Sequence, residues 1–505
     1  MAKPNILYIM TDQQRFDTIA ALGNEHIYTP NFDRLVRRGV TFTNAYSECP
    51  VCVPARYIIR SGSLPPKMGC YSNGAWHKPE GAPDNLEERC GPYLARTMKN
   101  LGYRTFGIGK FHTNPWNEDI GYDVHLHSEE LYRTPQQRDG DAYAKWIAEN
   151  YPAYDRENLM GERTEMYYQP QRSVQSAETT VEAWAAKKAK EQIALEDERP
   201  FFGLVSFVGP HPPLAPPEPF HRMYNPDLMP RPVKGDIEID HMDEQIPFMN
   251  RVIWADELND FSARLAKARY YGEISFIDMC LGKILDAVDS RSDADNTLIC
   301  FFTDHGEHLG DHNAWQKESF FEQSCHIPFL LSWPEKLESN TSNDAFVGLT
   351  DLFGIATTAA GTPELRDGID VLGIASGNTS GRDCLVGYYG KPGTPQFKVM
   401  VRWQDWKYIF IANGGREQLF NIKDDPQELT LQNDKAPAIL RRLRQYAAES
   451  CYKPGVDAAL DGADLKCFDL TPREPERVIQ MDKSKGADGF PEHPSDVLEG
   501  WEFSI

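Results

Sequence analysis

Two cysteines three positions apart are the first residues of this chain that could do chemistry. Cys49 and Cys52 lie in the stretch ECPVCVPARYIIRSG (residues 48–62), just before a segment that reads as a helix. This spacing is typical of thiol redox sites, but the flanking pattern of a small redox domain is missing. A zinc site would need a second pair, and Cys70 and Cys90 are single. The local chemistry alone allows four interpretations of these cysteines: a redox pair, a metal ligand, inert buried thiols, or the precursor of another group.

Further polar side chains stand at or just past the ends of four predicted strands. They are Asp12, Lys110, His112, His211, Asp304 and His305. The carboxyl ends of parallel strands meet at one edge of a sheet, and open α/β sheets bind their ligands there. The pattern therefore predicts a polar site at one edge of a sheet.

The segments that must position these side chains alternate between strand and helix patterns. Residues 4–11, 200–208 and 296–303 are apolar runs typical of strands that are buried on both faces. Residues 29–39 have helix start and stop signals, and apolar spacings of four and three over residues 262–288 predict a long amphipathic helix. The alternation predicts an α/β fold with a large, mostly parallel sheet sandwiched by helices.

The sequence pattern changes after about residue 377, where the alternation of strands and helices ends. Residues 398–422 have the pattern of an antiparallel meander, and a helix is predicted over residues 439–450. From Cys451 onward the chain is rich in Asp, Pro and Gly, which predicts an extended tail. We expect a catalytic domain over residues 1–377 and a smaller C-terminal antiparallel-sheet subdomain with this tail over residues 378–505.

The charge and length of the chain exclude some partners. The net charge of −22 over 505 residues argues against binding to nucleic acid, which requires many cationic contacts. An anionic substrate would need a local cluster of cations for the same reason. No apolar run of about 18 residues could span a membrane, so no membrane association is expected. The first residues read as a buried strand, which predicts a cytoplasmic protein, or a periplasmic or secreted one if a leader was removed.

Residues 52–62, CVPARYIIRSG, resemble the signature C-x-P-S-R-x-x-x-L-T-G of the formylglycine-dependent sulfatases in the alkaline phosphatase superfamily. Ala55 and Arg60 depart from the usual serine and leucine, and Ser61 replaces threonine. In that family the cysteine is oxidised to formylglycine, an aldehyde whose hydrated form attacks the sulfur of a sulfate ester. The resemblance therefore implies that Cys52 is converted and serves as the nucleophile.

The resemblance extends over most of the chain. Residues 6–15 (ILYIMTDQQR) correspond to the family's first metal-binding strand, and residues 301–312 (FFTDHGEHLGDH) resemble its TSDHGExLGDH motif. GIGKFH (residues 107–112) resembles GKWH, and VGPHPPLAPP (residues 208–217) resembles the HxPxxxP loop. LFNIKDDPQEL (residues 419–429) is similar to LYDLxxDPxE. An alkaline-phosphatase-like fold is implied.

These motifs imply a metal site and an anion site. The implied metal ligands are Asp12, Gln13, modified Cys52, Asp304 and His305. Gln13 stands where the family often has aspartate. Oxygen ligands suit one divalent cation, with Ca²⁺ expected and Mg²⁺ or Mn²⁺ as alternatives. The roles implied for the anion site are Lys110 and Lys317 on the sulfate, His112 assisting the diol, His211 as general acid and Arg56 orienting the modified residue.

Two residues of the stretch CYSNGAWH are candidates for polar contacts to the substrate. They are Asn73 and His77, and a plain turn is the alternative because Asn-Gly is a turn signal. Candidates for binding an acidic sugar are Arg133, Arg138 and Arg172, and the tail with His493 and Trp501 could cap the site or bridge subunits.

The leading hypothesis is a sulfatase that acts on a sulfated carbohydrate. The alternative is a phosphonate monoester hydrolase or phosphodiesterase of the same superfamily, which shares the modified cysteine and the Asp-Gln start. Lys110 and His112 favour sulfate, because the resemblance implies hydroxyl residues there in the phosphoesterases. A third hypothesis is a non-catalytic protein or a redox pair of Cys49 and Cys52. The expected partners are a sulfated small molecule or saccharide, a formylglycine-generating or anaerobic maturation enzyme, and further copies of the chain in a homo-oligomer.

Overall fold

A large sheet forms the centre of the molecule. The computed structural model describes residues 2–473 except residues 75, 131–134, 155–159, 162–166 and 236–240. The eight strands follow the order β4-β3-β5-β1-β6-β7-β2-β8. In chain order they are β1 Asn5–Thr11, β2 Val40–Tyr46, β3 Arg104–Gly109, β4 Val124–His127, β5 Phe201–Ser206, β6 Thr297–Thr303, β7 Phe329–Ser332 and β8 Thr341–Gly348. Only β7 pairs antiparallel within this described sheet, so the predicted mostly parallel sheet is confirmed.

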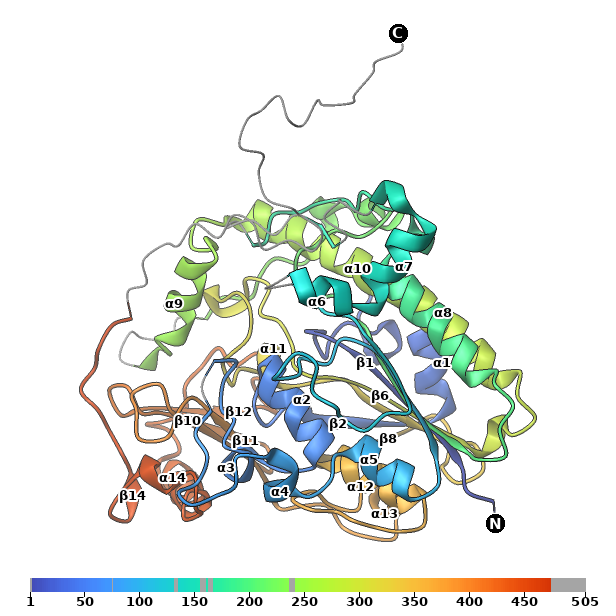
Figure 1. Cartoon of the computed structure of the whole chain (residues 1–505). Helices are drawn as coiled ribbons and strands as arrows, with labels where there is room; N and C mark the ends of the chain where they lie inside the picture. Colours follow the sequence, from blue (N-terminus) through green and yellow to red (C-terminus); the bar gives the residue numbers. More distant parts are fainter. Residues whose placement is uncertain are drawn as a thin grey trace.

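Helices cover both faces of this sheet (Figure 1). The longer ones are α1 Pro30–Arg38, α2 Cys52–Ser61, α5 Leu94–Asn100, α7 Ala142–Asn150, α8 Val181–Ile193, α9 Gln245–Val252, α10 Asp260–Asp289, α12 Asp351–Ala359 and α14 Pro437–Ser450. The shorter ones are α3 Pro65–Met68, α4 Leu86–Cys90, α6 Pro135–Gly140, α11 Glu322–Cys325 and α13 Val371–Ala375.

The central strand β1 is buried on both faces, which explains its continuous apolar sequence. Ile6, Tyr8 and Met10 belong to the core that includes α2, α5 and α12, whereas Leu7 and Ile9 belong to the core that includes α1, α8 and α10. Because successive side chains of a strand point to opposite faces, a strand covered on both sides must be apolar at every position.

A second sheet lies in the C-terminal part of the chain. Its strands β9 Cys384–Tyr389, β10 Lys398–Trp403, β11 Trp406–Ile411 and β12 Arg416–Asn421 form an antiparallel meander that α14 covers. Residues 460–465 form a two-stranded hairpin (β13 Leu460–Asp461, β14 Asp464–Leu465) where the sequence predicted an extended tail from Cys451. The buried side chains of Cys451 and Val456 explain the difference, because they pack into the core of the second sheet. The domain boundary at residue 377 stays a prediction, and His493 and Trp501 lie outside the described residues.

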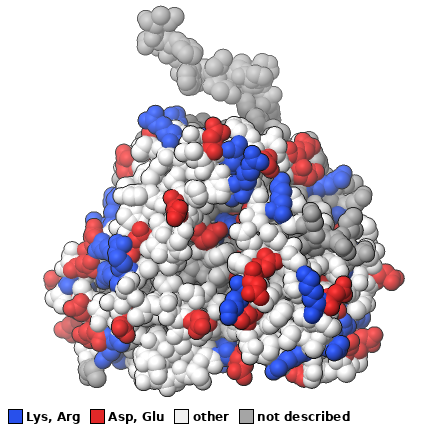
Figure 2. All heavy atoms as spheres, turned by 180° about the vertical axis from the view of Figure 1, so that it is seen from behind, with Lys and Arg blue, Asp and Glu red and all other residues white. Residues whose placement is uncertain are grey.

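The surface gives two further observations. Figure 2 shows acidic and basic side chains interspersed over the face opposite to that of Figure 1. In the part of the chain that is described, no helix combines the length and the apolar character needed to cross a bilayer. The expectation that nucleic acid is not a partner stays a prediction.

Candidate active site

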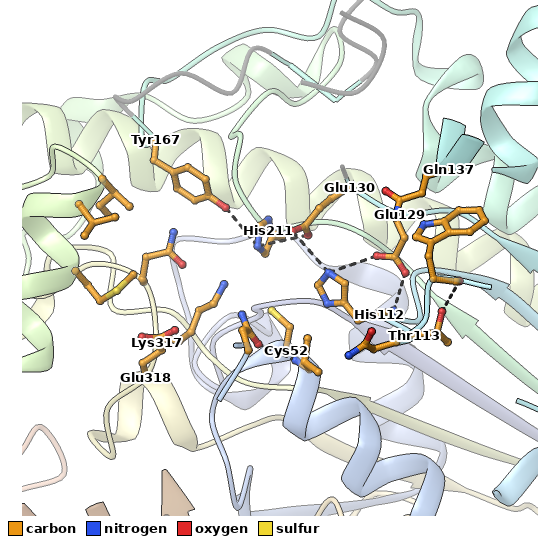
Figure 3. Close-up of a pocket in the computed structure, with 18 of the residues that line it drawn as sticks. Cys52, His112, Thr113, Glu129, Glu130, Gln137, Tyr167, His211, Lys317 and Glu318 are labelled. Atoms are coloured by element: carbon orange, nitrogen blue, oxygen red, sulfur yellow. Dashed lines mark hydrogen bonds and ion pairs between the residues drawn. The ribbon is translucent and has the colours of Figure 1, made fainter. Parts of the chain in front are cut away.

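The predicted edge of the sheet holds a cavity of about 440 Å³ (Figure 3). Cys52, His112, His211 and Lys317 line it, together with the carboxylates of Glu129, Glu130 and Glu318 and the aromatic rings of Trp76, Trp116 and Tyr167. The structure thus brings together side chains as far apart in the chain as Cys52 and Glu318. Four of the six anion-site residues proposed from the sequence, counting Cys52, line the cavity directly, and the other two, Arg56 and Lys110, lie beneath it.

Cys52 is the first residue of α2 and is buried. Asn73 Oδ1 accepts a hydrogen bond from the backbone N–H of Val53 at 3.0 Å, so Asn73 satisfies one of the free donors at the start of α2. Burial and the charge of Asp12 raise the pKa of the Cys52 thiol to about 12. Burial also raises the pKa of the Cys49 thiol, and all ten cysteines are free. A redox pair needs a low thiol pKa, so this environment does not favour one.

Four buried side chains form a group that could hold a metal ion. One ligand atom each from Asp12, Cys52, Asp304 and His305 lies within 4.8 Å of the others. His305 Nδ1 is 3.0 Å from the carbonyl oxygen of Gly306, while Nε2 is 3.1 Å from Cys52 Sγ. Burial lowers the pKa of His305 to about 3, which keeps the imidazole neutral. A neutral imidazole whose other nitrogen is hydrogen-bonded to a carbonyl is a typical metal ligand.

Arg56 bridges the two carboxylates of this group. Its Nη2 donates to Asp12 Oδ2 at 2.7 Å, and its Nε donates to Asp304 Oδ2 at 3.1 Å. Burial and the charge of Asp12 raise the pKa of Asp304 to about 7 in spite of Arg56. Burial also opposes ionisation of Asp12, but Lys110 and Arg56 together hold its pKa well below the usual range. The pair is therefore short of positive charge, as expected for carboxylates that bind a cation.

Gln13 has a backbone φ of 66°, in the left-handed region, directly after the metal-site residue Asp12. Its Oε1 accepts a hydrogen bond from Lys317 Nζ at 2.5 Å, and its Nε2 donates to Glu307. Glu307 also accepts from the backbone N–H groups of Leu309 and Gln316, at 2.9 Å each. The side chain of Gln13 thus links the metal site to the loop that carries Lys317.

Three basic side chains proposed for the anion site, Lys110, His112 and His211, converge on Glu130. Its carboxylate lies 3.5 Å from His211 Nε2 and 3.8 Å from His112 Nε2 (Figure 3). It also pairs with Lys110 Nζ. Lys110 Nζ also contacts Asp12 Oδ2 at 2.7 Å, so Lys110 connects the metal site to the anion site. Burial and the charge of Lys110 lower the pKa of His112 to about 4.

Glu129, in the loop after β4, has a contact role that was not predicted. Glu129 accepts hydrogen bonds from the backbone N–H groups of Phe111 (3.1 Å) and His112 (2.6 Å), and it contacts His127 Nε2 at 2.6 Å. Glu129 therefore holds His112 in a left-handed conformation with φ 49°. The signal in the sequence was an acidic pair just after a strand, but that four-residue strand was not recognised.

The other described candidate residues from the sequence do not line the cavity. His77 is not among the residues that line the cavity, although its neighbour Trp76 is. His308 and His312 have structural contacts, because His308 Nε2 lies 2.7 Å from Ser319 Oγ and the ring of His312 stacks on that of Phe321 at 4.1 Å. Arg138 and Arg172 do not line the cavity either, and Arg133 lies outside the described residues.

The fold and the site together define a class of enzyme. A mostly parallel α/β sheet whose edge carries a buried cysteine, a group of side chains that could hold a metal ion and a cluster of cations is suited to the hydrolysis of anionic esters. The model of the family described as Sulfatase matches residues 4–362, and that described as N-sulphoglucosamine sulphohydrolase, C-terminal, matches residues 310–449. The chain belongs to the sulfatase family and is a sulfuric ester hydrolase.

Similar proteins cover nearly the whole chain. An arylsulfatase of Clostridium perfringens (strain 13 / Type A) is 30% identical over 85% of this chain and 90% of its own length. A choline-sulfatase of Rhizobium meliloti (strain 1021) is 27% identical over 91% of this chain and 89% of its own. The structure of a phosphonate monoester hydrolase of Agrobacterium radiobacter has a TM-score of 0.73 at 24% identity, over 89% of this chain and 95% of that one, which shows the shared fold.

Proposed function

We propose that the enzyme hydrolyses sulfate esters of a carbohydrate with a nucleophile made from Cys52. The observation that carries this proposal is the convergence of Lys110, His112, His211 and Lys317 on the space beside Cys52. A sulfate ester is an anion that resists attack, so its charge must be neutralised by positive groups in a water-poor site. The second family model is named after a sulfohydrolase of an amino sugar, which supports a carbohydrate as the alcohol part.

The metal group fits a divalent cation because it offers two carboxylates and a neutral imidazole from buried positions. We propose that Asp12, Asp304, His305 and the modified residue 52 hold the cation, with Gln13 adjacent. Carboxylate oxygens favour Ca²⁺, with Mg²⁺ or Mn²⁺ as alternatives. When bound, the cation would supply positive charge for the sulfate oxygens and for activation of the nucleophile. Formylglycine would supply a hydrated carbonyl with one hydroxyl to attack and another to release the sulfate.

The protein's own residues position and neutralise the substrate. Lys110 and Lys317 both lie near the Cys52 position, and burial opposes but does not prevent their protonation, because Asp12 raises the pKa of Lys110 and Cys52 raises that of Lys317. Arg56 fixes the two carboxylates from below. We propose that Lys110 and Lys317 hold the sulfate group against the nucleophile, while Arg56 orients the modified residue and offsets the charge of the carboxylates.

His211 is the proposed general acid for the leaving oxygen. Its Nδ1 lies 2.6 Å from the carbonyl oxygen of Pro212, so its Nε2 faces the cavity, where Tyr167 OH lies at 3.4 Å. Burial lowers the pKa of His211, whereas Glu130 opposes this effect. A bound sulfate would add negative charge beside the imidazole and favour its protonated form, which is the form that can donate a proton.

Lys110→Ala should lower kcat/KM for an aryl sulfate by about 10²- to 10³-fold, because one preorganised positive group at the developing charge is lost. Release of 4-nitrophenol from 4-nitrophenyl sulfate measures the effect. Lys188→Ala removes a lysine of α8 that pairs with Glu191 on the surface, and it serves as the matched control. A loss of less than tenfold for Lys110→Ala would assign the anion site to other residues.

The phosphonate alternative has one observation in its favour, the similarity in fold to a phosphonate monoester hydrolase. Lys110 and His112 favour sulfate. We expect kcat/KM for 4-nitrophenyl sulfate to exceed that for 4-nitrophenyl phenylphosphonate by at least about tenfold. The two substrates share a leaving group, so the ratio measures the preference for the transferred group. A preference for the phosphonate would replace the proposed function by the alternative.

The proposal also includes the maturation enzyme and the substrate of the protein. Formation of formylglycine requires a maturation enzyme of the formylglycine-generating or anaerobic type, and a sulfated small molecule or saccharide is the substrate. The homo-oligomer and the boundary between residues 1–377 and 378–505 stay predictions.

A further inference from the structure

Lys317, which is proposed to hold the sulfate, lies between two residues with an uncommon backbone conformation. Gln316 and Glu318 have φ angles of 72° and 75°, in the left-handed region. Residues other than glycine seldom adopt this conformation and keep it only where surrounding contacts fix it. Lys317 lines the catalytic cavity, and Glu318 lies beside it (Figure 3). The contacts that fix residues 316 and 318 therefore determine where the ammonium group of Lys317 lies.

The backbone before Lys317 is held by two buried side chains. The N–H of Gln316 donates to Glu307 Oε1 at 2.9 Å and to Tyr168 OH at 3.1 Å. Tyr168 OH in turn donates to the carboxylate of Glu307. Neither of these residues belongs to the second sheet, so this side of the loop is fixed independently of it.

The backbone after Lys317 is held by the second sheet. Tyr389 OH, on β9, donates to Glu318 Oε2 at 2.9 Å. Lys398 Nζ, on β10, donates to the backbone carbonyl oxygen of Glu318 at 2.6 Å. The N–H of Glu318 donates to the carbonyl oxygen of Pro50 at 3.1 Å, in the segment just before α2. Glu318 thus connects the second sheet to the loop of Lys317 and to the segment that carries the nucleophile position.

Tyr389 and Lys398 are themselves fixed by their neighbours. They lie opposite each other in the register of β9 and β10, and Lys398 Nζ lies 4.5 Å from the centroid of the Tyr389 ring. Lys398 Nζ also pairs with Asp243 Oδ2 at 2.6 Å. Asp243 Oδ1 accepts from the N–H of Gln245 at 3.0 Å, and the side-chain amide of Gln245 donates to Glu318. Charge-assisted hydrogen bonds between buried groups are strong, so this network defines the position of Glu318.

The second sheet supplies none of the side chains to which a catalytic role was assigned above. Neither Tyr389 nor Lys398 is among the residues that line the catalytic cavity. We propose that Lys398 and Tyr389 are positioning residues, which act through Glu318 to hold Lys317 against the sulfate group. The anion site is then complete only when the second sheet is docked on the first. The inference rests on the proposed function, because it needs Lys317 to bind the sulfate.

A double-mutant cycle with Lys317→Ala tests this proposal, with kcat/KM for 4-nitrophenyl sulfate as the readout. Lys398→Met removes the ammonium group but keeps a long unbranched side chain, and it should lower kcat/KM about tenfold. Tyr389→Phe removes only the hydroxyl and should lower kcat/KM about threefold. In enzyme that already carries Lys317→Ala, either change should lower kcat/KM by less than about twofold, because the positioned group is absent. A residue that only stabilised the fold would cause the same loss in both backgrounds.

Tyr408→Phe is the matched control. Tyr408 is a buried residue of β11 in the same sheet, and its OH donates to the carboxylate oxygen Oε1 of Glu417 at 2.6 Å. Neither residue lines the catalytic cavity, so kcat/KM should match that of the wild type. The thermal unfolding midpoint of each variant shows whether it folds, and Tyr389→Phe decides the question if Lys398→Met does not.

Three results would overturn the proposal. They are unchanged kcat/KM in both Lys398→Met and Tyr389→Phe, losses that multiply with that of Lys317→Ala, and an equal loss in Tyr408→Phe. Failure of the wild type to release sulfate from any sulfate ester would instead refute the proposed function.

Discussion

Cys52→Ala should abolish sulfate release, with kcat/KM at least about 10⁴-fold below that of the wild type. Alanine leaves no group at this position that could be oxidised to an aldehyde, so the nucleophile is missing while the cations and carboxylates around it stay in place. The side chain is only 1% exposed and is the first residue of α2, where alanine is a good helix former. Sulfate release and the thermal unfolding midpoint, measured on the same preparation, separate lost chemistry from lost folding.

Cys49→Ala is the matched control for this variant. Cys49 is equally buried, and its Sγ lies 3.6 Å from the carbonyl oxygen of Tyr71, away from the metal group. It should keep most of its activity, whereas a redox pair would lose function in both variants. Mass spectrometry of the wild-type peptide from residue 39 to residue 56 gives a second measurement, because thiol-to-aldehyde conversion removes sulfur and two hydrogens and adds one oxygen. A fully active enzyme with an ordinary thiol at position 52 would contradict the assignment.

Removal of the divalent cation should have an effect of comparable size, at least about 10³-fold on kcat/KM. Chelation should inactivate the wild type, and adding back Ca²⁺, Mg²⁺ or Mn²⁺ separately should show which ion restores activity at the lowest concentration. Asp304→Asn should produce the same loss without chelator. The amide can still accept from the backbone N–H of His305, now at 3.0 Å, but it loses the negative charge that binds the cation.

Asp344→Asn removes an exposed carboxylate from β8 and is the control for Asp304→Asn. Its activity and its response to chelator should match those of the wild type. Full activity in enzyme whose metal content has been measured as zero would rule out a catalytic cation. Loss of activity that no divalent ion restores, in chelated protein that is still folded, would argue against exchangeable metal at this group.

The fold could be predicted wherever burial alone decides the pattern. β1, β5 and β6 are covered on both faces, so their apolar runs were evident, and the long helix α10 (Asp260–Asp289) follows from its own periodicity over residues 262–288. β4 and β8 were not predicted, because they lie at the two edges of the sheet and their polar sequences form strands only by pairing with β3 and β2. Tertiary pairing outweighs local propensity at such edges.

The site could be predicted to a similar extent. Residues at the ends of recognisable strands, such as Asp12, Lys110 and Asp304, could be assigned to one edge of the sheet from the sequence. The bridging position of Arg56 and the contacts of Glu129 and Glu130 could not be predicted, because they depend on how α2 and the loop after β4 pack against the sheet. Asn73 lines the cavity beside Cys52 and also accepts a hydrogen bond from the backbone at the start of α2, so its predicted contact with the substrate stays a prediction.

The burial of residue 52 also limits the time at which its side chain can be modified. Once α2 has packed against the sheet, residue 52 is only 1% exposed and lies at the bottom of the cavity of about 440 Å³, which is too small to admit a second protein. We therefore expect the proposed oxidation of Cys52 to precede the packing of α2 against the sheet. In each newly made chain, folding then competes with the oxidation of Cys52. We expect a chain that folds first to keep an unmodified thiol at position 52. We therefore expect the relative rates of oxidation and folding to determine which fraction of a preparation is active. A more stable folded protein would not increase that fraction.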